Sequence, residues 1–389
     1  MRGVDIPPFH AGDIGRRAAL LAAAGRDVIP MHFGEPSLGA PAAAIRAAHH
    51  ALDHERMVYW NSQPLRERIA RHYRDEYGVR VDPELILLTA GASAGLIAVF
   101  TALFAAGDRV GLLRPGYPAY RNSLRALGRE PVEIDCGPES GYRLTAERVR
   151  EVLAPLHGLV LASPNNPTGA MLSREQLAAV AAACRARGTR LISDEIYHSI
   201  TYAGRAACAL EVDPDAIVVN SFSKLFRMTG WRLGWLVAPA DCAPRLAAHL
   251  INFFLTPPSI SQFAALRAFD DLTELRAAVS TYAHNRARLL AELPRLGLTR
   301  MAAPDGAFYL YLDIAHLTDD SLAFCGRMLE ETGIAAAPGI DFDTANGGHH
   351  LRLSFAISSD LVERAIALLR QWLPRQMCGN SSLPPISSS

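Results

Sequence analysis

The sequence has no excess of charge, no long apolar run and no paired cysteines. Lysine and arginine together number 39, as do aspartate and glutamate, so the formal net charge is zero and favours neither nucleic acid nor an anionic membrane as a partner. The longest apolar run, at residues 96–106, is far shorter than the roughly 20 residues that a membrane-spanning helix needs. We therefore expect a buried helix there and no membrane contact.

The six cysteines form no C-x-x-C pair and show no zinc-binding spacing. The 13 histidines are scattered or directly adjacent, and adjacent residues on a helix do not face one metal ion. No basic start followed by an apolar stretch marks a secretory signal peptide. These features predict a reduced, cytoplasmic protein without a metal.

Five short apolar runs, each followed by a polar or glycine-rich cluster, predict buried parallel strands. Between the third and fourth runs, residues 174–187 have the length of a crossover helix, with a capping box at Ser173 and Gln176 and a stop at Gly188. The runs are residues 84–89, 109–113, 158–162, 189–193 and 216–220. Ligands of open α/β sheets bind beyond the carboxyl ends of the strands, so we expect one site there.

Outside these runs, periodicity predicts mainly helices. With 389 residues, the chain is long enough for two domains. The expected helices are residues 14–24, 41–52, 65–77, 281–293, 321–332 and 361–373, and the later strands are 306–312, with one exposed face, and 351–355. We therefore expect an α/β fold: a large domain whose mostly parallel sheet is sandwiched by helices, and a smaller α+β domain.

Lys224 lies just beyond the fifth run, in the segment S-F-S-K. A half-buried lysine loses its charge easily, which suits it to Schiff-base chemistry. Two hydroxyl groups and two guanidinium groups lie close in sequence and could bind a phosphate: Ser221, Ser223, Arg227 and Arg232. We therefore expect a reactive lysine beside an anion site.

Asp194 directly follows the fourth run, with Tyr197 three residues later. A carboxylate in this place could bind a metal, act as a general base or pair with a protonated pyridine nitrogen. No second acidic cluster with histidine spacing supports a metal.

The segment G-A-S-A-G at 91–95 follows the first run and opens a helix, so its backbone N–H groups could cradle a phosphate. It also matches G-x-S-x-G of serine hydrolases, with Ser93 as nucleophile, and S-F-S-K matches S-x-x-K of penicillin-binding enzymes, with Ser221. The companion motifs of both are missing, so these alternatives have little support.

Several motifs resemble those of one family. They are H-F-G-E-P at 32–36, S-P-N-N-P-T-G at 163–169, S-D-E-I-Y at 193–197, S-F-S-K at 221–224, T-G-W-R-L-G at 229–234 and L-R-L-S-F at 351–355. In order and spacing the chain resembles the class I/II aminotransferases, pyridoxal-phosphate enzymes related to aspartate aminotransferase. The resemblance implies their fold, fold type I of pyridoxal-phosphate enzymes.

The resemblance also implies roles for single residues. Lys224 would hold pyridoxal 5'-phosphate as a Schiff base and move the proton, and Asp194 would pair with the pyridinium. Asn166 and Tyr197 would donate hydrogen bonds to the phenolic oxygen, and Tyr117 would stack on the ring. Ser221, Arg232 and the N–H groups of Ala92 and Ser93 would bind the phosphate. Arg352 would clamp the substrate α-carboxylate, with Gly34 close by, and Tyr59 would reach the phosphate of the neighbouring subunit in a homodimer with shared sites.

We expect four parts: an N-terminal segment at 1–45 that packs with the small domain, a large cofactor domain at 46–280, a small domain at 281–376, and a tail at 377–389 that is rich in serine and proline and therefore disordered. The activity that the resemblance implies is ping-pong transfer of an amino group from an amino acid to a 2-oxo acid. No second arginine for a side-chain carboxylate is evident, and residues 252–258 are apolar, which argues against strict aspartate or glutamate specificity.

Other reactions are possible on the same scaffold, because the residues above would bind the cofactor in each of them. A lyase, racemase, decarboxylase or γ-replacement enzyme is therefore the main alternative. A regulator that has kept the fold would carry a DNA-binding segment, and no basic helix-turn-helix precedes residue 30.

Overall fold

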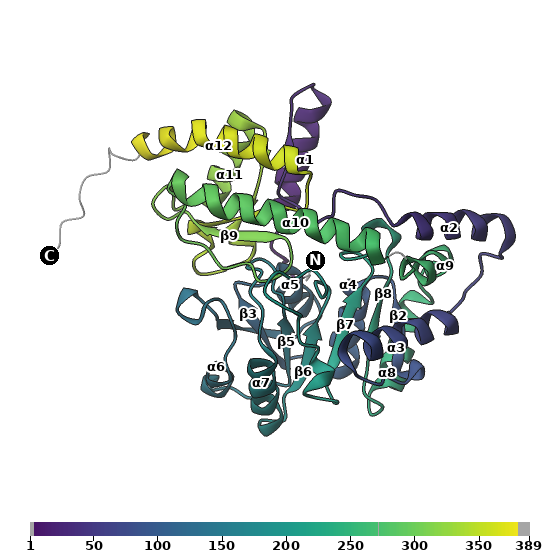
Figure 1. Cartoon of the computed structure of the whole chain (residues 1–389). Coiled ribbons are helices and arrows are strands. Elements are labelled where there is room, and N and C mark those ends of the chain that lie inside the picture. Colours follow the sequence, from purple (N-terminus) through teal and green to yellow (C-terminus); the bar gives the residue numbers. More distant parts are fainter. Residues whose placement is uncertain (1–3, 271, 380–389) are drawn as a thin grey trace. The chain divides into compact units, whose positions relative to one another are not determined.

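The computed structural model describes residues 4–270 and 272–379 (Figure 1), and these form two compact units. Unit 1 comprises residues 4–8, 35–280 and 303–307, and unit 2 comprises residues 9–34, 281–302 and 308–379. The domain boundaries inferred from the sequence stay a prediction. In the described part of the chain, no helix combines the length and apolar character needed to cross a membrane.

Unit 1 is built on a seven-stranded sheet in the order β2-β8-β7-β6-β5-β3-β4. All pairs are parallel except those of β8, which is antiparallel to both β2 and β7. The strands are β2 (Ile86–Thr89), β3 (Arg109–Arg114), β4 (Glu130–Asp135), β5 (Gly158–Ala162), β6 (Arg190–Asp194), β7 (Ile217–Ser221) and β8 (Gly234–Val237). The expectation that β2 has a parallel neighbour was wrong. Because β8 reverses the direction twice, β2 still points the same way as β7, and its carboxyl end lies at the same edge.

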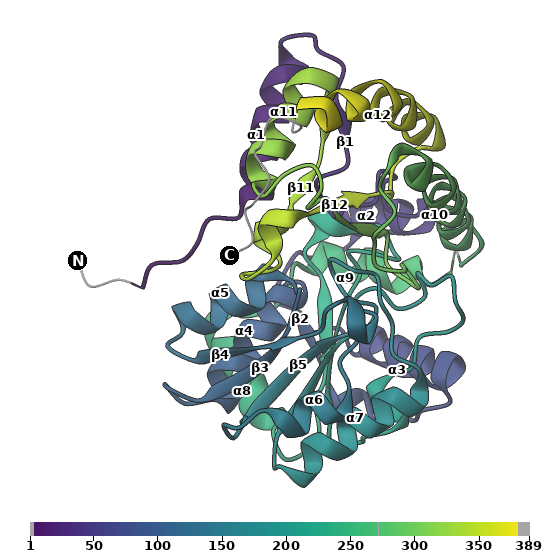
Figure 2. The same ribbon diagram turned by 90° about the vertical axis from the view of Figure 1, so that its left-hand side faces the viewer.

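Helices cover both faces of this sheet (Figure 2). Along β5, Leu159 and Leu161 pack in one apolar cluster while Val160 packs in the other, as the twofold alternation of a strand requires. This is why the strands are continuously apolar. One face carries α3 (Gln63–Tyr77), α6 (Ala146–Glu151) and α7 (Arg174–Ala186), and the other carries α4 (Ala92–Leu103), α5 (Pro118–Ala126) and α8 (Ala243–Phe254); α2 (Ala42–His54) packs on α9 (Ser259–Ala268).

The crossover helix α7 begins at the predicted capping box. The Ser173 hydroxyl accepts from the backbone N–H of Gln176 at 3.2 Å, and the Gln176 side chain accepts from the backbone N–H of Ser173 at 2.9 Å. Gly188 follows the helix at φ +66°, a conformation that glycine adopts without a steric cost. These local signals therefore set the helix as predicted.

Unit 2 is a small α+β structure. Its three-stranded antiparallel sheet has the order β11-β12-β9, and β1 and β10 form a separate two-stranded parallel sheet. The elements are α1 (His10–Ala23), β1 (Ile29–Pro30), β9 (Tyr309–Asp313), α11 (Ser321–Thr332), β10 (Ile334–Ala335), β11 (Ala337–Pro338), β12 (His350–Ser354) and α12 (Ser359–Gly379). Helix α10 (Leu272–Glu292) contributes its first part to unit 1 and the rest to unit 2.

Three predictions in this region differ from the structure. Helix α10 begins nine positions before the predicted residue 281. Strand β9 begins at Tyr309, and its first four side chains are all buried, so neither face is exposed as expected. Helix α12 extends to Gly379, so residues 377–379 are helical and not disordered; residues 380–389 lie outside the described part of the chain.

Candidate functional site

The sheet of unit 1 changes its winding direction between β3 and β5. After β3 the chain moves outward to β4, and after β5 it moves the other way to β6 and β7. Ligands of open α/β sheets bind beyond the carboxyl ends at such a point. The two loops that start here are joined, because the Asn165 side chain donates to the carbonyl of Pro115 at 3.1 Å. Tyr117 and Asn166 therefore belong to loops that meet at the switch point.

Asp194 ends β6 as a buried carboxylate. Its Oδ2 accepts a 2.6 Å hydrogen bond from the hydroxyl of Tyr120, and its Oδ1 accepts from the backbone N–H of Ile196 at 3.2 Å. Burial raises the pKa of Asp194 to about 6, while these two hydrogen bonds and the charge of Lys224 act in the opposite direction. At neutral pH this site consequently holds an anion with two fixed donors.

Lys224 lies three residues beyond β7, the strand beside β6. Its Nζ is 5.8 Å from the ring centroid of Tyr197, and its charge acts on Asp194. Asn166 is buried and follows β5, which pairs with β6 up to Asp194. The structure thus gathers Lys224, Asp194 and Tyr197 at the edge where the sequence predicted a site, with Asn166 on the neighbouring loop.

Tyr120 is a residue that the sequence reasoning missed. It lies in the first turn of α5, three positions after Tyr117, and the two rings pack edge to face at 5.3 Å. Positions three apart share one side of a helix, so the start of a helix at Pro118 was the signal that could have found it.

An anion cradle lies at the start of α4. Gly91 precedes the helix with φ +81°, and no side chain caps the N-terminus of α4. A Cβ atom at Gly91 would come within 2.3 Å of Nη2 of Arg232. The Arg232 guanidinium therefore lies directly against the turn that leads to the N–H groups of Ala92 and Ser93. Helix N-termini favour anions through these N–H groups and the helix dipole.

Arg232 reaches this place because β8 is antiparallel to its neighbours. The start of β8 pairs with the ends of β2 and β7, since Gly234 lies opposite both Thr89 and Ser221. The Ser221 hydroxyl donates to the carbonyl of Leu233 at 3.1 Å and lies 2.9 Å from the Ser223 hydroxyl. A guanidinium, two hydroxyl groups and a helix N-terminus thus meet, and these groups fit a phosphate.

The expectation that Arg227 takes part in this anion site was wrong. Arg227 is buried, and its guanidinium forms an ion pair with Glu274. Glu274 also accepts a hydrogen bond from the backbone N–H of Ala42 at 3.1 Å. Arg227 therefore neutralises a carboxylate that caps α2, a contact across 47 positions of sequence that spacing alone cannot reveal.

Arg352 lies in unit 2, on the central strand β12, and is 2% exposed. Its guanidinium donates to the carbonyl of His32 at 2.5 Å and lies 4.3 Å from the ring centroid of Tyr309 and 4.7 Å from that of Phe342. Burial, and after it the charge of Arg352, lowers the pKa of His32 to about 4, so this imidazole is neutral at pH 7. The arginine is therefore surrounded by two aromatic rings, a backbone carbonyl and a neutral imidazole, and its charge also acts on the buried carboxyl of Asp341.

Gly34 belongs to the same cluster in unit 2. A Cβ atom at this position would come within 1.8 Å of the Tyr309 hydroxyl oxygen, so the backbone approaches that hydroxyl as only glycine allows. Gly34 and Arg352, which are both substrate-binding candidates, are thus brought to one ring, that of Tyr309.

Tyr59 lies in unit 1 between α2 and α3 and is 78% exposed. Its segment is fixed on α9, because Gln262 donates to the carbonyl of Trp60 at 2.8 Å and the Trp60 ring stacks on Phe263. Further exposed apolar side chains border the start of α9, where the Ser259 hydroxyl lies 3.4 Å from the Met57 sulfur. We call Met57, Val58, Tyr59, Ile251, Phe253 and Leu255 the apolar surface.

The sequence and fold match known proteins over nearly the whole chain. Residues 26–369 match the family described as aminotransferase class I and II. The chain is 45% identical to a valine–pyruvate aminotransferase of Mycobacterium tuberculosis, over 95% of this chain and 97% of that one. It is 34% identical to an aspartate/prephenate aminotransferase of Thermus thermophilus, over 96% and 100% of the two chains.

Two solved structures give the same result. The crystal structure of an aminotransferase from Mycobacterium tuberculosis matches with a TM-score of 0.93 and 44% identity, covering 95% of this chain and 97% of that one. The aspartate aminotransferase from Thermus thermophilus with maleate matches with a TM-score of 0.88 and 33% identity, covering 95% and 100%. These matches confirm the fold class inferred from the sequence.

Proposed function

Because this chain belongs to the class I and II aminotransferases and is a pyridoxal-phosphate-dependent enzyme of that family, we propose that it transfers the amino group of an α-amino acid with an apolar side chain, such as valine, to pyruvate. Family membership also removes the support for a serine hydrolase acting through Ser93 or Ser221. The relative that suggests this substrate pair is the valine–pyruvate aminotransferase at 45% identity.

The aromatic rings around Arg352 support an apolar donor. The side chains around its guanidinium include the rings of Tyr309 and Phe342, and the backbone carbonyl of His32 accepts its hydrogen bond. We propose that Arg352 binds the α-carboxylate of donor and acceptor alike, with Gly34 close by. The planar guanidinium matches a carboxylate through two parallel hydrogen bonds.

The groups at the sheet edge of unit 1 would hold the cofactor. Bound pyridoxal phosphate supplies an electron sink for the negative charge that develops at the donor's α-carbon. We propose that the Asp194 carboxylate keeps the ring nitrogen protonated and that the Lys224 amine holds the cofactor and then takes and returns the α-proton. Asn166 and Tyr197 would donate to the phenolic oxygen, and Tyr117 would pack on the ring face.

The anion cradle would take the phosphate. Arg232 provides the positive charge, and the hydroxyl of Ser221 and the N–H groups of Ala92 and Ser93 provide donors. The close fit of Gly91 against Arg232 supports this role, because it places a guanidinium at a helix start whose N–H groups need an acceptor.

The apolar surface supports a homodimer. Its exposed side chains belong to two segments that border the start of α9, and a contiguous apolar patch on a protein marks an interaction site. We propose that a second copy of this chain covers it and that Tyr59 then reaches the partner's phosphate site. The five described cysteines are free and buried, which supports a reducing compartment, the cytoplasm.

The observation that carries the proposal is the buried Asp194 carboxylate, on which the charge of Lys224 acts, at the carboxyl ends of β6 and β7. The test is a half-reaction followed by the cofactor's absorbance. Valine should convert the holoenzyme fully, and pyruvate should restore it, whereas Lys224→Ala should abolish both steps. Rapid conversion by aspartate with no response to valine would overturn the substrate assignment, and full turnover by the lysine variant would overturn the site.

A further inference from the structure

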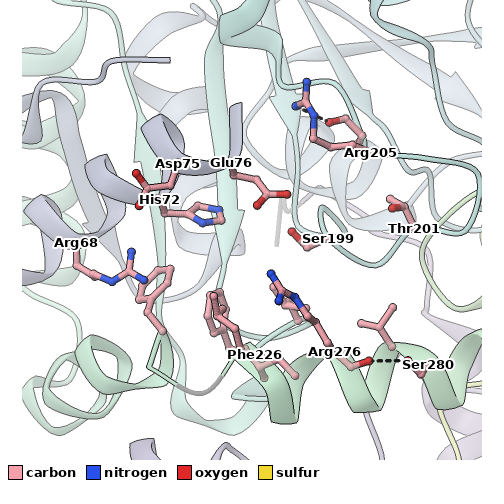
Figure 3. Close-up of a pocket in the computed structure, with 16 residues that line it drawn as sticks. Arg68, His72, Asp75, Glu76, Ser199, Thr201, Arg205, Phe226, Arg276 and Ser280 are labelled. Atoms are coloured by element: carbon pink, nitrogen blue, oxygen red, sulfur yellow. Dashed lines mark hydrogen bonds between the residues drawn. The ribbon is translucent and has the colours of Figure 1, made fainter. Parts of the chain in front are cut away.

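Unit 1 contains a pocket of about 490 Å³ whose lining includes none of the residues proposed to hold the cofactor (Figure 3). Its walls come from α3, from the first part of α10 and from the segment at 199–206, and its floor comes from the residues after Lys224. A cavity of this size accommodates a small organic molecule.

The floor of the pocket is apolar and rigid. Phe226 and Phe269 pack against each other at 4.8 Å and both pack on Phe222, which belongs to the main core. Leu275 and Val279 extend the apolar lining along one side of α10. This surface fits the side chain of an aliphatic or aromatic molecule.

Two opposite charges face this floor. Figure 3 shows the Arg276 guanidinium and the Glu76 carboxylate projecting into the pocket from α10 and α3. Neither forms an ion pair with any residue that the structure describes. By contrast, Arg205 is paired with Glu211 at 2.7 Å, and the Arg68 guanidinium lies 4.2 Å over the Phe269 ring.

We infer that this pocket binds a free α-amino acid with an apolar side chain, as a regulatory ligand. The ligand's carboxylate would pair with Arg276, its ammonium group with Glu76, and its side chain would cover Phe226 and Phe269. The polar groups of Ser199 and Thr201 line the same wall and provide hydrogen-bonding partners. A zwitterion matches one positive and one negative group across an apolar floor, whereas a simple anion leaves Glu76 without a partner.

The pocket is connected directly to the residues proposed for the chemistry. Leu225 and Phe226 in the floor immediately follow Lys224, and Ser199 in the wall lies two residues after Tyr197 at φ +64°. A ligand bound in the pocket would therefore contact both the segment that positions Lys224 and the segment that positions Tyr197. A ligand that fixes these segments changes the equilibrium between their arrangements, which is how a second site alters activity.

The experiment measures binding of L-leucine to the holoenzyme after borohydride has fixed the cofactor, so that the bound amino acid cannot react. Isothermal titration should show a leucine site that Arg276→Gln and Glu76→Gln each weaken at least tenfold. Arg125→Gln, an exposed change on α5, should leave it intact, as should Arg352→Gln in the proposed substrate site. The same leucine affinity in both pocket variants as in the unchanged protein would overturn the inference.

Ligand analogues test the zwitterion itself. 4-Methylpentanoate lacks the ammonium group and 3-methylbutylamine lacks the carboxylate, so each should bind at least tenfold more weakly than leucine. Equal binding of 4-methylpentanoate would show an anion site and overturn the assignment of Glu76.

The regulatory role requires that leucine change the rate of valine–pyruvate transfer in the unmodified protein but not in Arg276→Gln. An equal effect of leucine on both proteins would contradict the regulatory role. Loss of the transfer reaction with retained leucine binding would count against the proposed function alone.

Discussion

The hydroxyl of Tyr120 donates a 2.6 Å hydrogen bond to Oδ2 of Asp194, and both groups are buried. Burial alone favours the protonated acid, which cannot balance a positive ring nitrogen. The hydrogen bond favours the carboxylate, so Tyr120 holds the pKa of Asp194 below the value that burial alone would set. Tyr120 is thereby a positioning residue for Asp194.

Replacing Tyr120 by phenylalanine should raise the pKa of Asp194 above its value of about 6. A hydrogen bond to a charged group contributes about 1.5–3 kcal/mol, which corresponds to about one to two pKa units. Cofactor affinity should therefore begin to fall, as the pH is lowered, about one to two pH units higher than in the unchanged protein. Titration of the apoprotein with the cofactor between pH 5 and 8 measures this. Tyr202→Phe, which removes a 2.7 Å hydrogen bond to the carbonyl of Ala307, is the matched control and should leave this pH dependence unchanged.

Gly91→Ala should weaken cofactor binding by displacing Arg232. The new Cβ atom would lie 2.3 Å from Nη2 of Arg232, and the backbone is already at φ +81°. Gly107→Ala separates the two effects, because Gly107 is at φ +84° with no atom within 4 Å of a built Cβ. Both variants carry a similar backbone strain, so equilibrium dialysis should show a loss of affinity of roughly tenfold or more only for Gly91→Ala. An equal loss in both would point to strain alone.

Arg352→Lys should weaken the binding of both substrates while the cofactor stays bound. Lysine keeps the charge but cannot form two parallel hydrogen bonds to a carboxylate, so KM for donor and acceptor should each rise on the order of 100-fold. Steady-state kinetics with valine and pyruvate measure this. Arg300→Lys in the same unit changes an exposed ion pair with Asp313 and should leave both constants unchanged. A rise in KM for one substrate only would contradict a shared carboxylate site.

Glu195→Gln should change how the stability of the apoprotein depends on pH. Burial raises the pKa of Glu195 from 4.5 to about 7, although its Oε1 accepts from the N–H of Ala209 at 2.7 Å and the hydroxyl of Ser193 at 3.0 Å. Between these pH values the folded state holds a proton that the unfolded state has lost. The contribution of Glu195 to stability is therefore complete below pH 4.5 and is lost as pH rises through about 7.

The variant lacks this titration, so the free energy of unfolding of the unchanged protein should fall relative to that of Glu195→Gln as pH rises from 4.5 to 7.5. The relative change should reach up to about 1.4 kcal/mol for each pH unit. Urea unfolding at several pH values measures it, and parallel curves for the two proteins would contradict the assignment.

Local signals in the sequence predicted much of the fold. The apolar runs predicted five strands within one or two residues, and the Ser173 capping box predicted the start of α7. Strand β8 was missed, because its four residues, the first of them a glycine, show no clear period. Its antiparallel pairing depends on two strands that are distant in sequence. The buried faces of β9 were missed for the same reason, since burial on a second face comes from packing.

The sequence by itself determined which chemical groups follow which strands, because strand ends, helix caps and glycine turns depend on short stretches of the chain. Only the tertiary structure decided which of those groups meet. Tyr120 meets Asp194 across 74 positions of sequence, and Arg227 pairs with Glu274 and not with the anion site. Arg232 lies against Gly91 because β8 is antiparallel to its neighbours. The physical reason is that a contact between distant segments depends on the packing of whole elements, which no local pattern of residues encodes.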